Sequence, residues 1–134
     1  MAKAKILIVD DNEFIRTLLL SRLGASGYQA SAAESGAAAL EMVRIDPPDL
    51  VLLDIAMAGM DGFQTGKKIR EVCGPGGPSI VMVTAQGQHE NMLRAFEELG
   101  VAGYVVKPFK PAELLSEIER ALALRKKGAT DGQG

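Results

Sequence analysis

Short apolar runs alternate with longer segments of helical period along the chain, and this alternation constrains the fold more than any other feature. The runs are rich in β-branched residues and continuously apolar, which is typical of strands buried on both faces of a sheet. Five runs occur: residues 6–9, a weaker run at 28–33, and residues 50–53, 80–83 and 104–106. Five repeats of a strand followed by a helix predict an α/β fold, a doubly wound parallel sheet with helices on both faces.

The segments between the runs are predicted to be helices. Residues 37–43 are rich in alanine and favour a helix, whereas Gly66 weakens the helix over residues 62–73 by about 1 kcal/mol. The other three segments each carry apolar residues on one helical face. These faces are Ile15, Leu18, Leu19 and Leu23; Met92, Ala95, Phe96 and Leu99; and Leu114, Leu115, Ile118, Ala121 and Leu122.

Length and composition indicate one domain over residues 1–125 of the 134-residue chain. Residues 126–134 lack apolar periodicity, and we expect them to be disordered. A net charge of -2 argues against direct nucleic-acid binding. No stretch approaches the roughly 20 apolar residues that cross a bilayer. Cys73 is the only cysteine, which excludes an internal disulfide, and we therefore expect a cytoplasmic location.

Four of the apolar runs end at polar residues that can take part in chemistry. Because the carboxyl ends of parallel strands lie along one edge of a sheet, we expect these side chains to converge on one crevice. In chain order they are Asp10 and Asp11, then Asp54, Thr84 and Lys107.

Three carboxylates in one crevice need a cation to stay ionised at neutral pH. Oxygen ligands without cysteine or histidine favour Mg²⁺, or Mn²⁺ in its place. Such an ion typically serves phosphoryl transfer. Lys107 offers a positive charge to a phosphoryl oxygen and Thr84 offers a hydroxyl donor. One carboxylate is then available as the nucleophile.

Simpler structural explanations exist for the same residues. Asp10 and Asp11 are suitable caps for the helix that follows them. The Thr84 hydroxyl is of a kind that often bonds to backbone, and Tyr104 suits a half-buried place in its strand. We expect Asp61 to cap the third helix.

At these positions the sequence resembles the receiver domain of response regulators, the chemotaxis-regulator-like module of two-component signalling. The resemblance spans residues 5–125 and implies a flavodoxin-like (βα)5 sheet with strand order 2-1-3-4-5. It rests on four segments: Val9-Asp10-Asp11-Asn12, residues 54–62 (Asp-Ile-Ala-Met-Ala-Gly-Met-Asp-Gly), Val83-Thr84-Ala85, and residues 103–109 (Gly-Tyr-Val-Val-Lys-Pro-Phe).

The resemblance implies a phosphorylation switch rather than an enzyme that acts on a separate substrate. Asp54 would be the phosphoacceptor, with Mg²⁺-dependent self-phosphorylation and self-dephosphorylation. Asp11 and Asp54 would bind Mg²⁺ directly and Asp10 largely through water. The main-chain carbonyl of Ala56 would complete the protein ligands.

The resemblance also implies how the signal leaves the site. Lys107 would pair with the phosphoryl group, and Thr84 would move toward it and let Tyr104 turn inward. This change would remodel the face formed by the fourth helix, the fifth strand and the fifth helix. The Lys107–Pro108 peptide bond would be cis.

The implied partners are proteins. A histidine kinase or a phosphotransfer protein would supply the phosphoryl group, and a downstream protein target would read the altered face. The chain would act as a monomer or a weak phosphorylation-dependent dimer. It would be either a stand-alone regulator or a receiver cut from a longer chain.

Some positions depart from the family pattern. Ala58 stands where the family commonly has proline, so we expect a less rigid loop after Asp54. Ala56 and Gln86 occupy flanking positions that vary across the family and that, by the resemblance, would tune phosphate lifetime.

Three other functions compete with a phosphorylation switch. A haloacid-dehalogenase-like phosphotransferase needs an aspartate two residues after its nucleophile, where this chain has Ala56. A nucleotide-binding enzyme needs a glycine-rich loop after the first strand, where Asp10 and Asp11 stand instead. A receiver-like module that is never phosphorylated is the third alternative.

Overall fold

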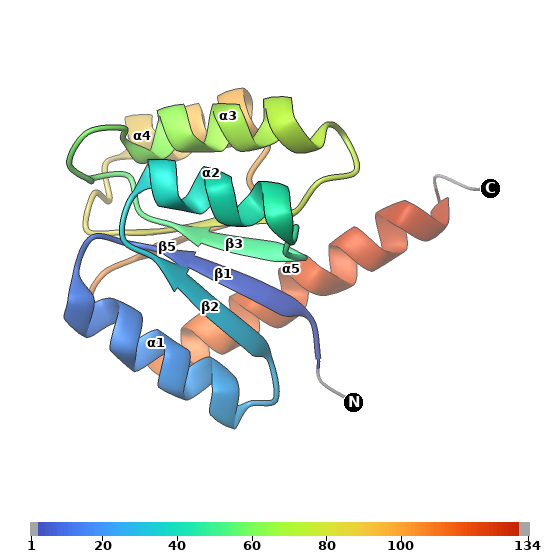
Figure 1. The fold of residues 1–134 in the computed structure, drawn as a ribbon, viewed down its shortest axis with the longest axis horizontal. Helices are drawn as coiled ribbons and strands as arrows, with labels where there is room; N and C mark the ends of the chain where they lie inside the picture. Colours follow the sequence, from blue (N-terminus) through green and yellow to red (C-terminus); the bar gives the residue numbers. More distant parts are fainter. Residues whose placement is uncertain (1–2, 132–134) are drawn as a thin grey trace.

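A parallel sheet of five strands forms the centre of the molecule, with helices on both of its faces (Figure 1). The computed structural model describes residues 3–131, and the side chains of residues 3–125. The strands are β1 (Lys5–Val9), β2 (Gln29–Ala33), β3 (Leu50–Leu53), β4 (Ser79–Thr84) and β5 (Gly103–Val106). Their order is β2-β1-β3-β4-β5, which confirms the predicted topology.

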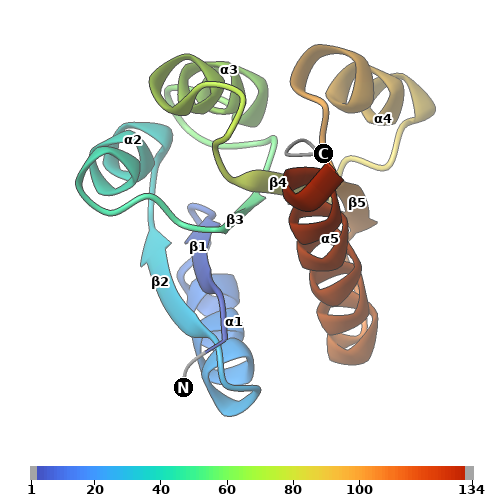
Figure 2. The same cartoon turned by 90° about the vertical axis from the view of Figure 1, so that its right-hand side faces the viewer.

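Helices connect successive strands, as the alternation of the sequence predicts. They are α1 (Glu13–Ala25), α2 (Gly36–Ile45), α3 (Gly62–Cys73), α4 (His89–Arg94), which continues as a π-helical segment η1 (Ala95–Leu99), and α5 (Pro111–Asp131). Figure 2 shows α2, α3 and α4 on one face of the sheet and α1 and α5 on the other. This two-sided cover explains why β3 is buried at every position.

Two apolar clusters fill the space between the sheet and its helices. Strand residues alternate between them, because successive side chains point to opposite faces. Leu7 and Val9 pack with α2, α3 and η1, whereas Ile6 and Ile8 pack with α1 and α5. The clusters fix the register of the central strands, in which Val9 lies beside Leu53.

The helix starts are capped by side chains. The Asn12 side chain accepts a hydrogen bond from the Ile15 N–H at the start of α1. The simpler explanation of Asp10 and Asp11 as caps of this helix does not hold, because asparagine caps equally well and stands next to the first helical residue. Asp61 caps α3 as predicted, and its contacts with Gln64 complete a reciprocal capping box.

Two further expectations need correction. Phe96 is 46% exposed rather than buried, because the wider π-helical turn changes the spacing that an α-helix would give. The predicted disordered tail at residues 126–134 begins too early, since α5 continues to Asp131. Residues 132–134 lie outside the described part of the chain.

Candidate functional site

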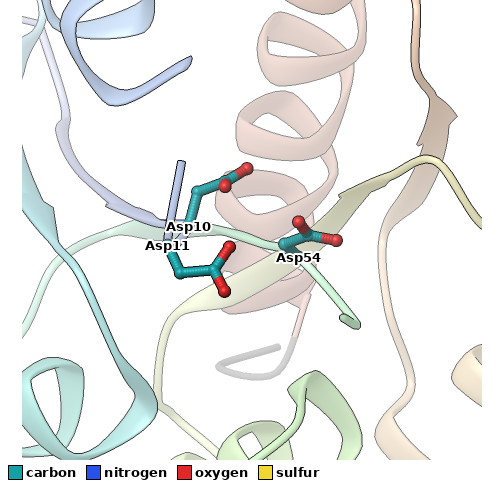
Figure 3. A group of neighbouring side chains, drawn as sticks. All are labelled: Asp10, Asp11 and Asp54. Carbon is teal, nitrogen blue, oxygen red and sulfur yellow. The ribbon is translucent and has the colours of Figure 1, made fainter. Parts of the chain in front are cut away.

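Three carboxylates meet at the C-terminal edge of the sheet. Asp10 and Asp54 directly follow the paired strands β1 and β3, and the Asp54 N–H donates to the Val9 carbonyl across 3.0 Å. One oxygen from each of Asp10, Asp11 and Asp54 lies within 4.8 Å of the others. Figure 3 shows the three side chains directed toward a common space. Asp10 and Asp54 are buried, and Asp11 is exposed.

Lys107, which follows β5, joins this group from across the sheet. Its Nζ lies 2.6 Å from Asp10 Oδ2 and 3.1 Å from Asp54 Oδ2. Burial disfavours the charged ammonium, but the hydrogen bond and the attraction of Asp10, helped by Asp54, outweigh burial and raise the pKa of Lys107. Burial also raises the pKa of Asp10, against the opposing hydrogen bond from Lys107. The predicted convergence of Asp10, Asp11, Asp54 and Lys107 is confirmed.

Several contacts that the sequence did not predict hold the carboxylates in place. The Asn12 N–H donates to Asp10 Oδ1 across 2.9 Å, and the Arg16 guanidinium donates to the main-chain carbonyl of Asp10 across 2.8 Å. Ala58 N–H donates to Asp11 Oδ2 across 3.4 Å, a contact that proline at this position would lack. The sequence offers one signal for the role of Arg16, which is its place in the first turn of α1, six residues after Asp10.

Thr84 and Tyr104 lie next to the carboxylate group rather than within it. Thr84 is fully buried at the end of β4. Its hydroxyl accepts the Gln86 N–H across 3.2 Å, and its carbonyl accepts the Lys107 N–H across 2.8 Å. The half-buried Tyr104 packs against the first apolar cluster and donates its hydroxyl to the Gln86 carbonyl. Burial, and then the charge of Asp54, raise the pKa of Tyr104.

The sequence was compared with models of known protein families. The model of the response regulator receiver domain matches residues 6–119. The chain belongs to the response regulator receiver family. Receiver domains serve as phosphorylation switches in two-component signalling, and they are not a class of enzymes in the ordinary sense.

Curated relatives of this receiver domain fall into two kinds. The chemotaxis protein CheY of Halobacterium salinarum is 39% identical over 91% of this chain and 98% of its own length. The probable transcriptional regulator ycf27 of Guillardia theta is 39% identical over 95% of this chain. The chain spans about half the length of such longer relatives, 48% in that example.

Solved structures agree with the fold. The chemotaxis protein CheY4 of Vibrio cholerae has a TM-score of 0.84 at 32% identity, covering 90% of this chain and 99% of its own. A CheY-like receiver domain protein of Methanospirillum hungatei has a TM-score of 0.86 at 29% identity, covering 95% and 98% of the two chains. NtrX of Brucella abortus reaches 0.90 at 32% identity, covering 99% of this chain and 29% of its own.

The residues of this receiver domain fit a hard divalent cation. The three clustered carboxylates offer only oxygen ligands, and one ammonium, that of Lys107, lies against two of them. Such an acidic, oxygen-only group suits Mg²⁺. Receiver domains generally bind Mg²⁺ at an acidic pocket of this kind. The ligand role of the Ala56 carbonyl stays a prediction.

The peptide bond between Lys107 and Pro108 is cis, as the resemblance implied. Within residues 3–131, no helix is both long enough and apolar enough to cross a bilayer.

Proposed function

We propose that this receiver domain accepts a phosphoryl group on Asp54 and that the modification changes its binding surface. The observation that carries the proposal is the position of the Asp54 carboxylate. It is buried beside Asp10 and Asp11, and its Oδ2 lies 3.1 Å from the Lys107 ammonium. A carboxylate held among charges that can neutralise a phosphoryl group is suited to be a nucleophile in phosphoryl transfer.

Magnesium belongs to this proposal. Asp11, Asp54 and the main-chain carbonyl of Ala56 would hold the ion directly, and Asp10 would hold it largely through water. When bound, Mg²⁺ supplies positive charge that neutralises the phosphoryl oxygens. Mn²⁺ offers the same chemistry as a substitute.

The phosphoryl transfer needs only the donor, the Asp54 carboxylate and a proton from solvent. A carboxylate oxygen of Asp54 attacks phosphorus and forms a new P–O bond while the P–N bond of a donor phosphohistidine breaks. The leaving imidazole keeps the electron pair and takes a proton from solvent. Lys107 then pairs with a phosphoryl oxygen, and Asp54 carries an acyl phosphate that water can later hydrolyse.

The proposed output is a change on the face formed by α4, β5 and α5. The new charge draws Lys107 and Thr84 toward Asp54, and Tyr104 follows Thr84. Exposed apolar side chains occur on these elements, with Leu93 of α4 47% and Val106 of β5 40% exposed. A coupling free energy of about 1–3 kcal/mol would change the affinity for a partner roughly 5- to 150-fold.

The proposed partners are a histidine kinase or phosphotransfer protein as donor and a protein target as receiver of the signal. The curated relatives include both a receiver that stands alone and longer regulators. The CheY relative is matched over nearly its whole length, and the ycf27 relative over about half of its length. We propose a cytoplasmic domain that binds no nucleic acid directly and acts as a monomer or a weak phosphorylation-dependent dimer, on its own or within a longer regulator.

Incubation with Mg²⁺ and acetyl phosphate tests this function. The expected result is an increase in intact mass by one phosphate, lost when the metal is chelated and absent in Asp54→Ala. A control variant, Asp61→Ala, changes an aspartate that caps α3 and should still gain the phosphate. No gain with any donor would favour the alternative of an interaction module that is never phosphorylated.

A further inference from the structure

The connection between β4 and α4 is held in three directions by one residue, Gln86. Its N–H donates to the Thr84 hydroxyl across 3.2 Å, and its carbonyl accepts the Tyr104 hydroxyl. Its side-chain Oε1 accepts Asn91 Nδ2 across 3.1 Å. Gln86 is therefore in direct contact with a residue at the site, a residue of β5 and a residue of α4.

Asn91 donates to two amides of this connection, and we call its contact with Gln86 the amide clasp. The Nδ2 of Asn91 donates to Gln86 Oε1 and to Gln88 Oε1, each across 3.1 Å. An amide nitrogen carries two hydrogens, so it can serve both acceptors at once. Gln88 stands at the N-cap position of α4 but caps no backbone N–H with its side chain. The clasp thus joins the connection to the first turn of the helix.

Little else fixes α4 at this end. Within the described part of the chain, none of its six residues is buried. The buried side chains that follow it in the sequence, Ala95 and Leu99, belong to η1. Segments with few buried apolar contacts open most readily. Contacts at the N-terminal end of α4 should therefore have a large influence on where this helix lies.

The connection also lies close to β5. A Cβ atom added to Gly87 would come within 3.1 Å of Val106 Cγ1, which is tighter than an ordinary contact. The connection therefore cannot shift at residue 87 without changing its contact with the exposed side of β5. A movement that starts at Thr84 would reach both β5 and α4 through residues 86–88.

We propose that Gln86 and Asn91 are positioning residues that transmit the state of the phosphorylation site to α4. This inference rests on the proposed function and names the contacts that carry its output. The main chain of Gln86 follows Thr84 and Tyr104, and the clasp passes this displacement to the helix. Without the clasp, Asp54 would still be phosphorylated, but α4 would respond less.

Three substitutions separate this role from a merely structural one. Asn91→Ala removes the donor of the clasp on a residue that contacts none of the site residues. Gln86→Met removes the acceptor but keeps both main-chain contacts of residue 86. Gln88→Met is the matched control, because it removes a similar amide while leaving the contact between Gln86 and Asn91 in place.

Hydrogen exchange over residues 85–99, measured with and without acetyl phosphate and Mg²⁺, tests the proposal, with the extent of phosphorylation followed by intact mass. We expect Asn91→Ala to be phosphorylated to the parent's extent. Its phosphorylation-dependent change in exchange should fall at least about twofold, the effect of one net hydrogen bond. Gln86→Met should lose the same share of this change in exchange per phosphorylated molecule, and the double variant should lose no more than either single variant. Gln88→Met should respond like the parent.

Other outcomes would overturn the inference. One is that Asn91→Ala changes its hydrogen exchange on phosphorylation as much as the parent does. Another is that the effects of Asn91→Ala and Gln86→Met add in the double variant. The third is that Gln88→Met loses as much of the change as Asn91→Ala does. If the parent were never phosphorylated, the proposed function would fail on its own. The clasp would then still be tested in the unmodified protein, where Gln86→Met should exchange about two- to tenfold faster near residue 91, and no difference would refute it.

Discussion

Lys107 supplies positive charge to two buried carboxylates of the unmodified site, those of Asp10 and Asp54. Its side chain is 17% exposed, and those of Asp10 and Asp54 are 4% and 8% exposed. Removing one partner of a buried ion pair leaves the other charge without compensation, which costs more than the pair itself contributes. Under the proposed function, the same ammonium would pair with a phosphoryl group on Asp54.

We predict that Lys107→Ala lowers the free energy of unfolding by about 3 kcal/mol when metal is chelated. Mg²⁺ should restore part of this loss, because it supplies positive charge at the same carboxylates. Chemical denaturation with and without Mg²⁺ measures both effects. The control Lys110→Ala changes an exposed lysine and should stay within about 0.5 kcal/mol of the parent. Equal losses in the two variants would contradict this account.

The same substitution should separate phosphorylation from its output. We predict that Lys107→Ala still gains some phosphate on Asp54 but loses the change in exchange over α4 and β5. The reason is that no ammonium is left to move toward the phosphoryl group. Intact mass and hydrogen exchange on one sample measure the two properties together. A variant that switched like the parent would show that Lys107 is not the coupling cation.

Residue types at strand ends made most of the site predictable. Asp10, Asp54 and Lys107 could be placed together because the C-terminal ends of parallel strands share one edge. The roles of Asn12 and Arg16 could not be predicted, because they depend on how the first turns of α1 lie against the strand end. Local preference does not distinguish Asn12 from the neighbouring aspartates as a cap.

At the scale of elements, α3 and η1 are packed unusually closely. A Cβ atom added to Gly66 of α3 would lie 2.7 Å from Leu99 Cδ1. Glu98 beside this contact accepts hydrogen bonds from Lys67 and Arg94, and the Arg94 guanidinium lies 3.8 Å from the ring centroid of Phe63. Gly66, which weakens the helix by propensity, is therefore required by the approach of η1.

We predict that Gly66→Ala destabilises the protein by about 1 kcal/mol. The gain in helix propensity of about 1 kcal/mol is smaller than the cost of overpacking, which reaches about 1–3 kcal/mol. Gly24→Ala in α1 is the matched control, since no atom lies within 4 Å of its added Cβ, and it should stabilise the protein. Urea denaturation of both variants measures the difference, and stabilisation by both would refute the close packing.

Glu98 should give the link between α3 and η1 a pH dependence. Hydrogen bonds from Lys67 and Arg94 lower the pKa of Glu98 below its ordinary value of 4.5. A lowered folded-state pKa contributes stability above the unfolded-state pKa, and this contribution is lost as pH falls through the folded-state pKa. The difference in unfolding free energy between the parent and Glu98→Gln should therefore shrink from pH 6 to pH 3. If the difference in unfolding free energy stayed constant over this pH range, the ion pairs of Glu98 with Lys67 and Arg94 would be contradicted. Glu97→Gln, which changes an exposed neighbour, is the control.

Elements were predicted well where apolar patterns are continuous. Each strand begins and ends within one residue of the sequence prediction. The pattern failed for Phe96 and for the end of α5. A π-helical turn has no signature in apolar spacing, and the last turns of α5 extend past the sheet (Figure 1), where no buried face is needed.

On the scale of the whole molecule, the sheet order brings together residues that lie about a hundred positions apart. Lys107 meets Asp10 because β5 and β1 end at the same edge, with β3 and β4 between them. The proposed output face lies beside this edge, and residues 85–88 connect the end of β4 to the start of α4.

Mg²⁺ binding should stabilise the entire domain. A ligand at 100 times its dissociation constant adds about 2.7 kcal/mol when it binds only the folded state. We predict a rise in melting temperature with Mg²⁺ that Asp11→Asn largely removes, because it loses the charge of one ligand. Thermal unfolding across a Mg²⁺ titration measures this, with Ca²⁺ as a test of size preference. A full shift in Asp11→Asn would show that the ion binds elsewhere.

The most direct test of the account is to locate the phosphoryl group within the chain. After reaction with acetyl phosphate and Mg²⁺, tandem mass spectrometry of the tryptic fragment spanning residues 45–67 should place one phosphate on Asp54. The same fragment from a sample with chelated metal should carry none. Phosphate on Asp46, Asp49 or Asp61 instead, or equal labelling without a divalent ion, would contradict the claim that the clustered carboxylates make Asp54 the acceptor.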